Sequence, residues 1–268
     1  MKFRLFAVAA LAVTALCGCS TSAKKTLVLY YSQTGATKAI AEELQNQLGA
    51  DIACIEALEP YDADYATTVA RWRQERENGI KVAIQPLTIN LAQYDTIFLG
   101  FPIWGGTCAS PMATFLADNS LTGKKVVTFA TFGSGGIESA TADVVKAQPD
   151  ATVIEGYGVR NARIGKATAE IRRFLIENGY VKGEIAPLPE YGEPVPVTEA
   201  DIAIFDAACG NYQFPLGTPI TVAKRSYDNT EDYRFDVKSQ TPDGSEASST
   251  IYVVFQQGDT PEFTRVVR

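Results

Sequence analysis

The chain has 268 residues, a net charge of −7 and no histidine. An acidic chain with few clusters of Lys and Arg is not expected to bind nucleic acid, because phosphate backbones attract concentrated positive charge. The absence of histidine removes the commonest general base and the commonest transition-metal ligand. The five cysteines have no metal-binding spacing, so we expect no metal site.

The first 19 residues have the pattern of a bacterial export signal. Lys2 and Arg4 precede an apolar run, 5–16, that is too short to span a bilayer well. The stretch "LCGCS", residues 16–20, resembles the bacterial lipoprotein box, and this resemblance makes Cys19 the acylated first residue of the mature protein. An ordinary signal peptide cleaved nearby is the alternative. Several acyl chains, at about 0.8 kcal/mol per buried CH₂, would hold the protein on a membrane.

The residue after Cys19 indicates where the anchor would insert. Ser20 is not the aspartate that marks inner-membrane retention in enteric bacteria. We therefore expect a lipid-anchored protein of the cell envelope, at the outer membrane of a Gram-negative bacterium, with the membrane as one of its partners.

Strands and helices alternate from residue 26 to about residue 180. The first run, 26–31, is almost continuously apolar, which is typical of a strand buried on both faces. The expected strands are 26–31, 51–57, 94–102, 123–133 and 151–159, and the expected helices are 36–49, 62–79, 110–119, 137–149 and 165–179. Five strands separated by helices predict a doubly wound parallel sheet with helices on both faces, over a domain at 24–182.

The composition changes near residue 183. Four prolines fall within 186–197, so we expect an extended linker at 183–198. A helix is expected at 198–209, followed by alternating strands at 218–228, 231–240, 248–257 and 262–268. These patterns predict a small α+β domain, 199–268, that ends in an antiparallel meander and whose role the sequence does not show.

The loop between the first strand and the first helix has the features of an anion site. Backbone N–H groups without partners, together with the helix dipole, attract an anion at a helix N-terminus. Ser32, Thr34 and Thr37 add hydroxyl groups, and Gly35 allows the backbone to turn close to a ligand. A plain helix capped by Ser or Thr is the alternative.

Two further loops follow the third and fourth strands. Residues 102–106 place Trp104 at a loop tip, where an indole either stacks on a flat conjugated ring or packs over the sheet edge. Residues 133–136 hold three glycines in four positions, which suits a backbone facing a polar ring edge; a flexible connector is the alternative. In the strand order 2-1-3-4-5, strands 1, 3 and 4 are adjacent, so all three loops should meet at one edge.

The stretches "LVLYYSQTGATKAIAEELQ", "YDTIFLGFPIWGGT" and "GKKVVTFATFGSGG" resemble the flavodoxin family over about residues 26–180. That family binds FMN, so the resemblance implies a flavodoxin-like five-stranded sheet of order 2-1-3-4-5 and an FMN cofactor. The residues it implies for the FMN phosphate are Ser32, Gln33, Thr34, Gly35, Ala36 and Thr37. The residues it implies for the isoalloxazine are Pro102, Ile103, Trp104 and Gly105 on one side, with Trp104 stacking, and Thr131, Phe132, Gly133, Ser134, Gly135 and Gly136 on the other.

The chain departs from the family pattern at two places. Many relatives have a second aromatic residue where this chain has Gly105, and they often have a polar pair where it has Thr131 and Phe132. Phe132 is therefore a candidate for contact with the flavin ring. Both departures concern the ring more than the phosphate.

The resemblance implies an electron-transfer flavoprotein whose partner is a redox protein or a small-molecule electron acceptor. No catalytic residue is assigned, because FMN would carry the chemistry. A phosphate loop without cations in an acidic chain predicts a low reduction potential. The alternatives are an NAD(P)H-dependent FMN quinone reductase and an anchored binding module without a functional flavin.

Three cysteines follow Cys19. An odd number in an exported protein cannot be fully paired internally. Cys54 lies in an apolar strand and Cys209 on an apolar helix face, so both are expected to be buried, whereas Cys108 is expected to be a small loop residue without a role.

Overall fold

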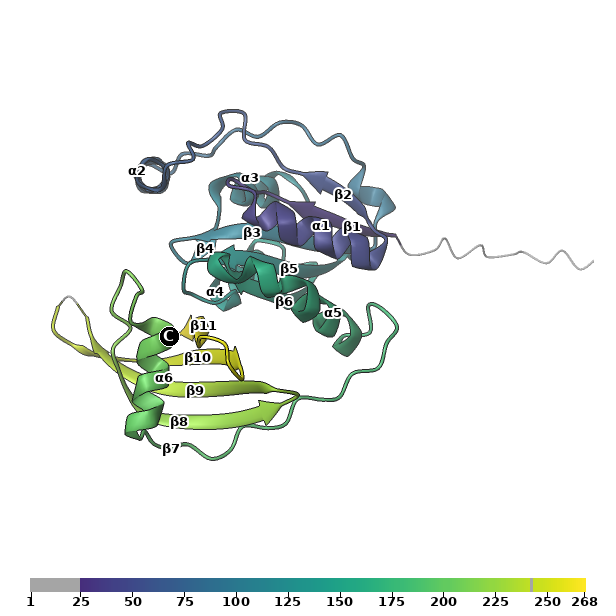
Figure 1. The fold of residues 1–268 in the computed structure, drawn as a ribbon. Helices are drawn as coiled ribbons and strands as arrows, with labels where there is room; N and C mark the ends of the chain where they lie inside the picture. The colour runs from purple at the N-terminus through teal and green to yellow at the C-terminus, as the bar shows by residue number, and fades with distance from the viewer. Residues whose placement is uncertain (1–24, 242) are drawn as a thin grey trace, which may run out of the picture.

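The computed structural model describes residues 25–241 and 243–268, which form an α/β part and a smaller C-terminal part (Figure 1). The export signal and Cys19 lie outside the described residues. Within those two ranges, no helix is both long and apolar enough to cross a membrane.

The α/β part is built on a parallel sheet. Its strands, in spatial order, are β2 (Asp51–Cys54), β1 (Thr26–Tyr30), β3 (Thr96–Trp104), β5 (Lys125–Phe132) and β6 (Thr152–Arg160). The short strand β4 (Thr107–Cys108) pairs with the end of β3 in antiparallel fashion. The five parallel strands thus have the predicted order 2-1-3-4-5, which is confirmed.

Helices cover both faces of this sheet (Figure 1). One face packs against α1 (Ala36–Leu48) and α5 (Ala167–Glu177), and the other against α3 (Ser110–Asp118) and α4 (Glu138–Ala147). The remaining helical segments are α2 (Tyr65–Glu77) and two 3₁₀ turns, η1 (Leu91–Gln93) and η2 (Asn161–Lys166). The sheet is therefore buried on both sides, as the apolar strands predict.

The C-terminal part is an antiparallel sheet with one helix. Its strands, in spatial order, are β11 (Glu262–Val267), β10 (Glu246–Gln256), β9 (Thr230–Gln240), β8 (Thr218–Tyr227) and β7 (Val195–Pro196). Helix α6 (Glu199–Cys209) begins with a capping box between Thr198 and Asp201. Its apolar side packs on the sheet through Phe205 and Cys209, which gives this part its own core.

The proline-rich segment 183–198 is attached to the C-terminal sheet over its second half. Tyr191 donates a hydrogen bond to Asp232, and the Gly192 N–H donates to the carbonyl of Lys224. β7 then pairs with β8 as an edge strand, where proline is tolerated because one side of the strand needs no hydrogen bonds. This half of the segment is therefore part of the sheet rather than a free connection.

The burial of the three described cysteines can be compared with the prediction from the sequence. Cys209 is buried, as predicted. Cys54 is exposed, so that prediction is wrong: β2 is the outermost strand of its sheet and is covered less completely than the central strands. Cys108 is buried in β4, where burial raises the pKa of its thiol to about 12.

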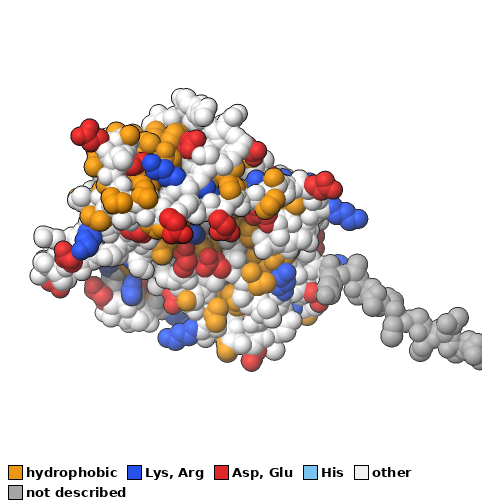
Figure 2. All heavy atoms as spheres, turned by 90° about the horizontal axis from the view of Figure 1, so that it is seen from below, with side chains coloured by type: hydrophobic (Ala, Val, Ile, Leu, Met, Phe, Trp, Pro, Cys, Tyr) orange, Lys and Arg blue, Asp and Glu red, His pale blue; other side chains and the backbone are white. Residues whose placement is uncertain are grey.

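The face seen from the side of the C-terminal part mixes acidic, basic and apolar side chains (Figure 2). It presents no continuous basic surface.

Gly100 in β3 is packed closely against β5, so Gly100→Ala should destabilise the protein. A Cβ at this position would lie 2.0 Å from the Phe129 ring, and both residues are in the central strands. Overpacking of this kind costs about 1–3 kcal/mol, and urea denaturation should show a loss of that size.

Gly165→Ala is the matched control. A Cβ there would meet open space, so the free energy of unfolding should change by no more than about 0.5 kcal/mol. Equal stability of the two variants would contradict the packing described for β3 and β5.

Candidate functional site

The candidate site lies where β1, β3 and β5 end. These strands are neighbours, so the loops that follow them emerge at one edge of the sheet. The Tyr31 N–H donates to the Gly100 carbonyl, and the hydroxyls of Thr37 and Thr131 are hydrogen-bonded at 2.8 Å. The first loop is therefore fixed to β3 on one side and to β5 on the other.

The first loop, 32–37, offers polar groups that the rest of the described chain does not satisfy. The Ser32 hydroxyl is buried without a hydrogen-bond partner. Gly35 has the left-handed φ of 92° and precedes α1, whose start has no side-chain cap. The first backbone hydrogen bond of α1 runs from the Ala39 N–H to the Gly35 carbonyl. The backbone N–H groups before Ala39 are therefore left for a ligand. Buried unsatisfied groups are costly, and together these point to an anion.

Two side chains of this loop already have partners. Gln33 donates to the backbone carbonyl of Asp62 and to the Thr68 hydroxyl, and Thr37 is bonded to Thr131. Thr34 is exposed, as are the backbone atoms of Gly35. The groups free to face an anion are thus the backbone N–H groups and the Ser32 and Thr34 hydroxyls, whereas Gln33 and Thr37 shape the loop.

The second loop is a tight hairpin rather than an open tip. Pro102 and Ile103 are still in β3, and Gly105 and Gly106 turn the chain into β4 with φ values of 56° and 85°. Trp104 is half-buried at the end of β3. The Gly106 carbonyl accepts a hydrogen bond from Ser139 of α4, which fixes the turn.

Trp104 belongs to an aromatic cluster. Its ring centroid lies 6.0 Å from that of Tyr31 and 4.8 Å from that of Tyr61, both in edge-to-face geometry. The indole of Trp72 covers Gly105, because a Cβ there would be 2.0 Å from its ring. Trp72, from α2, thus brings a second aromatic ring beside the hairpin.

Helix α2 is held at this edge by a buried carboxylate. Glu75, only 6% exposed, accepts hydrogen bonds from Tyr61 at 2.6 Å, Ser110 at 2.9 Å and Arg71 at 2.8 Å. The Arg71 guanidinium lies 3.9 Å from the centroid of the Tyr61 ring. Burial, and then the bond to Glu75, raise the pKa of Tyr61. The network therefore keeps Tyr61 against Trp104.

Sequence reasoning missed this network. The sequence predicts a helix at 62–79, but it gives that helix no part in the site. The available signal was a tryptophan, Trp72, within a strongly polar stretch, next to an Arg71–Glu75 pair at the spacing of one helical turn.

The third loop begins where β5 ends. Thr131 and Phe132 are the last residues of β5 and both are buried. The Phe132 ring packs in the core near Ile137 and Gly158, so the structure places it away from solvent rather than on an open surface. Its contact with a flavin, like the other residue assignments, stays a prediction.

Residues 133–136 are held from outside the loop. The Gly133 carbonyl accepts a hydrogen bond of 2.7 Å from Arg160, and the Ser134 carbonyl accepts one of 2.9 Å from the Val266 N–H. Sequence reasoning assigned neither Arg160 nor Val266 to the site. No local pattern signals either contact, because Arg160 lies on another strand and Val266 lies in the C-terminal sheet.

The charges near the site differ from the sequence-based expectation. Lys38, the one cation close to the first loop in sequence, is exposed and lies 3.7 Å from Glu42. Arg71 is neutralised by Glu75, but Arg160 donates to two carbonyl oxygens, those of Gly133 and Phe263. A guanidinium remains charged at neutral pH, so the third loop has a positive charge beside it.

Glu75→Ala should loosen α2 and alter the environment of Trp104. The change leaves Tyr61, Ser110 and Arg71 without their shared acceptor, at a cost of about 1–3 kcal/mol. The chain has two tryptophans, Trp72 and Trp104, and both adjoin this network, so intrinsic fluorescence reports on it directly. We expect red-shifted emission and a lower unfolding midpoint.

Glu77→Ala is the control, because Glu77 is an exposed residue of the same helix. It should change neither emission nor midpoint. A Glu75→Ala protein that behaves like this control would contradict the role given to the carboxylate.

Comparisons with known proteins agree with this geometry. The model of the flavodoxin family matches residues 25–174, which is more than half of the 268-residue chain. A comparison with curated proteins gave no match.

Among solved structures, a proposed flavoprotein of Bacteroides eggerthii is 31% identical, with a TM-score of 0.48 over 56% of this chain and 97% of that one. A flavoprotein of Lactobacillus acidophilus in complex with FMN is 27% identical, with a TM-score of 0.44 over 55% and 99%. The match of the family model, together with the strand order and the three loops at one edge, shows that the chain belongs to the flavodoxin family.

Proposed function

We propose that this protein binds FMN where β1, β3 and β5 end and transfers electrons at a bacterial membrane. The observation that carries the proposal is the first loop. In a member of the flavodoxin family, the buried Ser32 hydroxyl and the N–H groups before Ala39 lack partners at the place where the resemblance puts the FMN phosphate.

The residues present fit FMN. The Ser32 and Thr34 hydroxyls and the N–H groups that open α1 would hold the phosphate, and the helix dipole would favour its charge. Trp104 would contact the ring system, and the backbone of 133–136 would bind its polar edge. When bound, FMN supplies one- and two-electron redox chemistry; the chain orients it and limits its access to water.

The aromatic cluster around Trp104 would form the wall that contacts the flavin ring. Tyr31 and Tyr61 pack edge-to-face with the Trp104 indole, and the Glu75 network fixes Tyr61 in turn. Because the rotamer of Trp104 is already fixed, its side chain loses little conformational entropy when a flat ring binds, and the cluster therefore favours tight binding.

Electron transfer is preferred to a self-contained reductase. The cysteines in the described part of the chain are free, and no group of acidic or cysteine side chains in those residues is arranged to hold a metal ion. Electrons would then pass between FMN and an external protein or small molecule. Steady oxidation of NADH or NADPH by the purified, FMN-loaded protein would instead support the quinone-reductase alternative.

Trp104→Ala and Thr34→Ala should each weaken FMN binding, by about tenfold or more, which corresponds to about 1.4 kcal/mol. The first change removes the ring contact and the second removes a hydroxyl at the phosphate. Quenching of flavin fluorescence during titration of the purified protein into FMN measures both dissociation constants. Flavin absorbance bands in the purified wild-type protein provide the first check.

The control is Thr152→Ala, because Thr152 is exposed at the opposite end of the sheet, where β6 begins. It should bind FMN as the wild type does. Unchanged affinity in the Trp104 and Thr34 variants would reject this site, and a wild type without measurable FMN binding would favour an anchored binding module.

Membrane anchoring through Cys19 is a separate part of the proposal and is tested separately. Cys19→Ser removes the thiol that would be acylated, so the protein should move from the membrane fraction to the soluble fraction of the cell envelope. Cys17→Ser, two residues earlier in the same box, should leave the protein in the membrane fraction. If both variants stay membrane-bound, the lipid anchor is not at Cys19.

A further inference from the structure

Strand β11 contacts the α/β part along most of its length. It is the edge strand of the C-terminal sheet, paired with β10 on one side. On its other side, β11 meets the α/β part next to β6 and α4 (Figure 1). Four of its residues make polar contacts there: Glu262, Phe263, Arg265 and Val266.

Three of these contacts converge on the third loop of the candidate site. The Val266 N–H donates to the Ser134 carbonyl. Arg265 forms an ion pair of 3.1 Å with Glu138, whose carboxylate occupies the space beside Gly136. The loop is thus held near its middle and at its end by one strand of the other part.

Arg160 makes the third contact and bridges the two parts. It ends β6 beside the last residue of β5, and it donates from Nε to the Gly133 carbonyl and from a terminal nitrogen to the Phe263 carbonyl at 2.8 Å. Its guanidinium also lies 3.4 Å from the centroid of the Phe263 ring. A planar group with several fixed donors suits this double contact, whereas lysine could not reproduce it.

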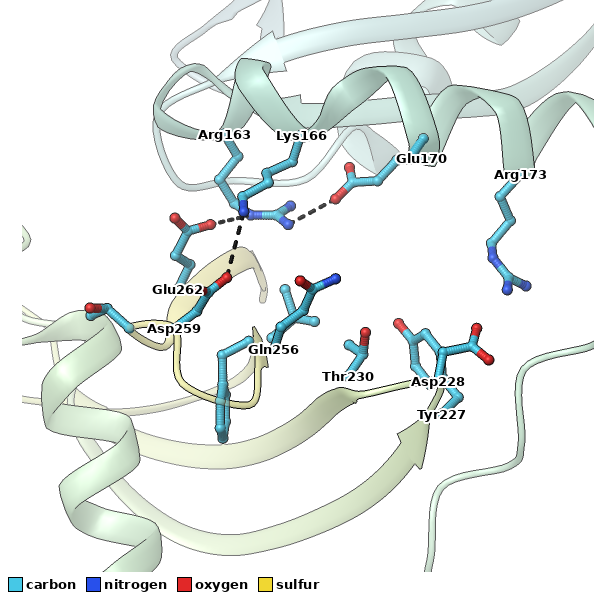
Figure 3. A pocket seen from close by; sticks show the side chains of 14 residues that line it. Arg163, Lys166, Glu170, Arg173, Tyr227, Asp228, Thr230, Gln256, Asp259 and Glu262 are labelled. Carbon is cyan, nitrogen blue, oxygen red and sulfur yellow. Dashed lines mark hydrogen bonds and ion pairs between the residues drawn. The ribbon is translucent and has the colours of Figure 1, made fainter.

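Two cations of η2 make further contacts between the two parts. Arg163 bridges Glu170 of α5 and Glu262 of β11, and Lys166 pairs with Asp259 just before that strand (Figure 3). These contacts border a hollow of about 510 Å³ between the two parts. The cations on its wall are already paired with acids, so the hollow itself gives no reason to assign a ligand.

A loop with three glycines in four positions needs such support. Glycine loses more backbone freedom on ordering than any other residue, so a loop of this composition that orders only on ligand binding weakens that binding. A loop already fixed before the ligand arrives avoids this cost.

We propose that the C-terminal part is a component of the cofactor site, in which β11 and Arg160 hold loop 133–136 ready to bind FMN. Arg160 is a positioning residue, since it acts through the Gly133 carbonyl. The inference rests on the proposed FMN binding, and it gives the C-terminal part a role in cofactor affinity rather than one confined to covering the sheet.

The test compares Arg160→Met with Arg173→Met. Arg173 is also half-buried; it contacts Glu177 and the Ala186 carbonyl, and it touches neither the loop nor β11. Amide hydrogen exchange of Val266 in the FMN-free protein measures the contact with Ser134 directly, and an FMN titration measures affinity. For Arg160→Met we expect at least tenfold faster exchange at Val266 and an FMN dissociation constant raised about tenfold.

Arg173→Met should change neither quantity. Arg160→Lys, which keeps the charge, should resemble Arg160→Met if the double contact matters, and it also provides a second variant should Arg160→Met fold poorly. If both Arg160 variants have the wild-type rate of Val266 amide exchange and the wild-type FMN dissociation constant, the inference is overturned, while the proposed FMN binding stands. A wild type that binds no FMN would overturn the proposed function, and exchange at Val266 would still decide whether Arg160 fixes the loop.

Discussion

The unpartnered N–H groups at the start of α1 are the constraint around which the site is arranged. A helix that begins at the end of a buried strand directs these donors toward one edge of the sheet, and Gly35 allows the turn that brings them there. The bonds from Tyr31 to Gly100 and between Thr37 and Thr131 then fix this loop to the neighbouring strands. An anion at this position would satisfy groups that nothing else in the described chain satisfies.

The five parallel strands were predictable because strands buried on both faces must be apolar throughout. Their order was implied by the resemblance to the flavodoxin family, and that order placed the three loops together. The same reasoning failed at Cys54, because an apolar sequence does not show that a strand lies at the sheet edge. It also failed to show that part of the proline-rich segment, as β7, pairs with the C-terminal sheet.

The parts of the site that were missed depend on contacts between distant segments. Glu75 looks like a surface charge until Tyr61 and Ser110 are seen to donate to it. Val266 reaches the third loop only because the C-terminal sheet packs beside β6 and α4, and Arg160 reaches it because β6 ends beside β5. Periodicity and turn signals describe one segment at a time, and so they cannot supply interactions of this kind.

Arg160 also changes the electrostatic argument. The low potential expected from the sequence relied on net charge and on a phosphate loop without cations. Charges act mainly within a Debye length of about 8–10 Å, so groups beside the site outweigh the total. Because Arg160 donates to carbonyls of Gly133 and Phe263, its charge is not cancelled by a directly bonded carboxylate. A positive charge at the third loop favours added negative charge nearby, and it therefore opposes the effect of the acidic chain. The residue that joins the two parts of the molecule would thus influence both the shape and the electrostatic field of the site.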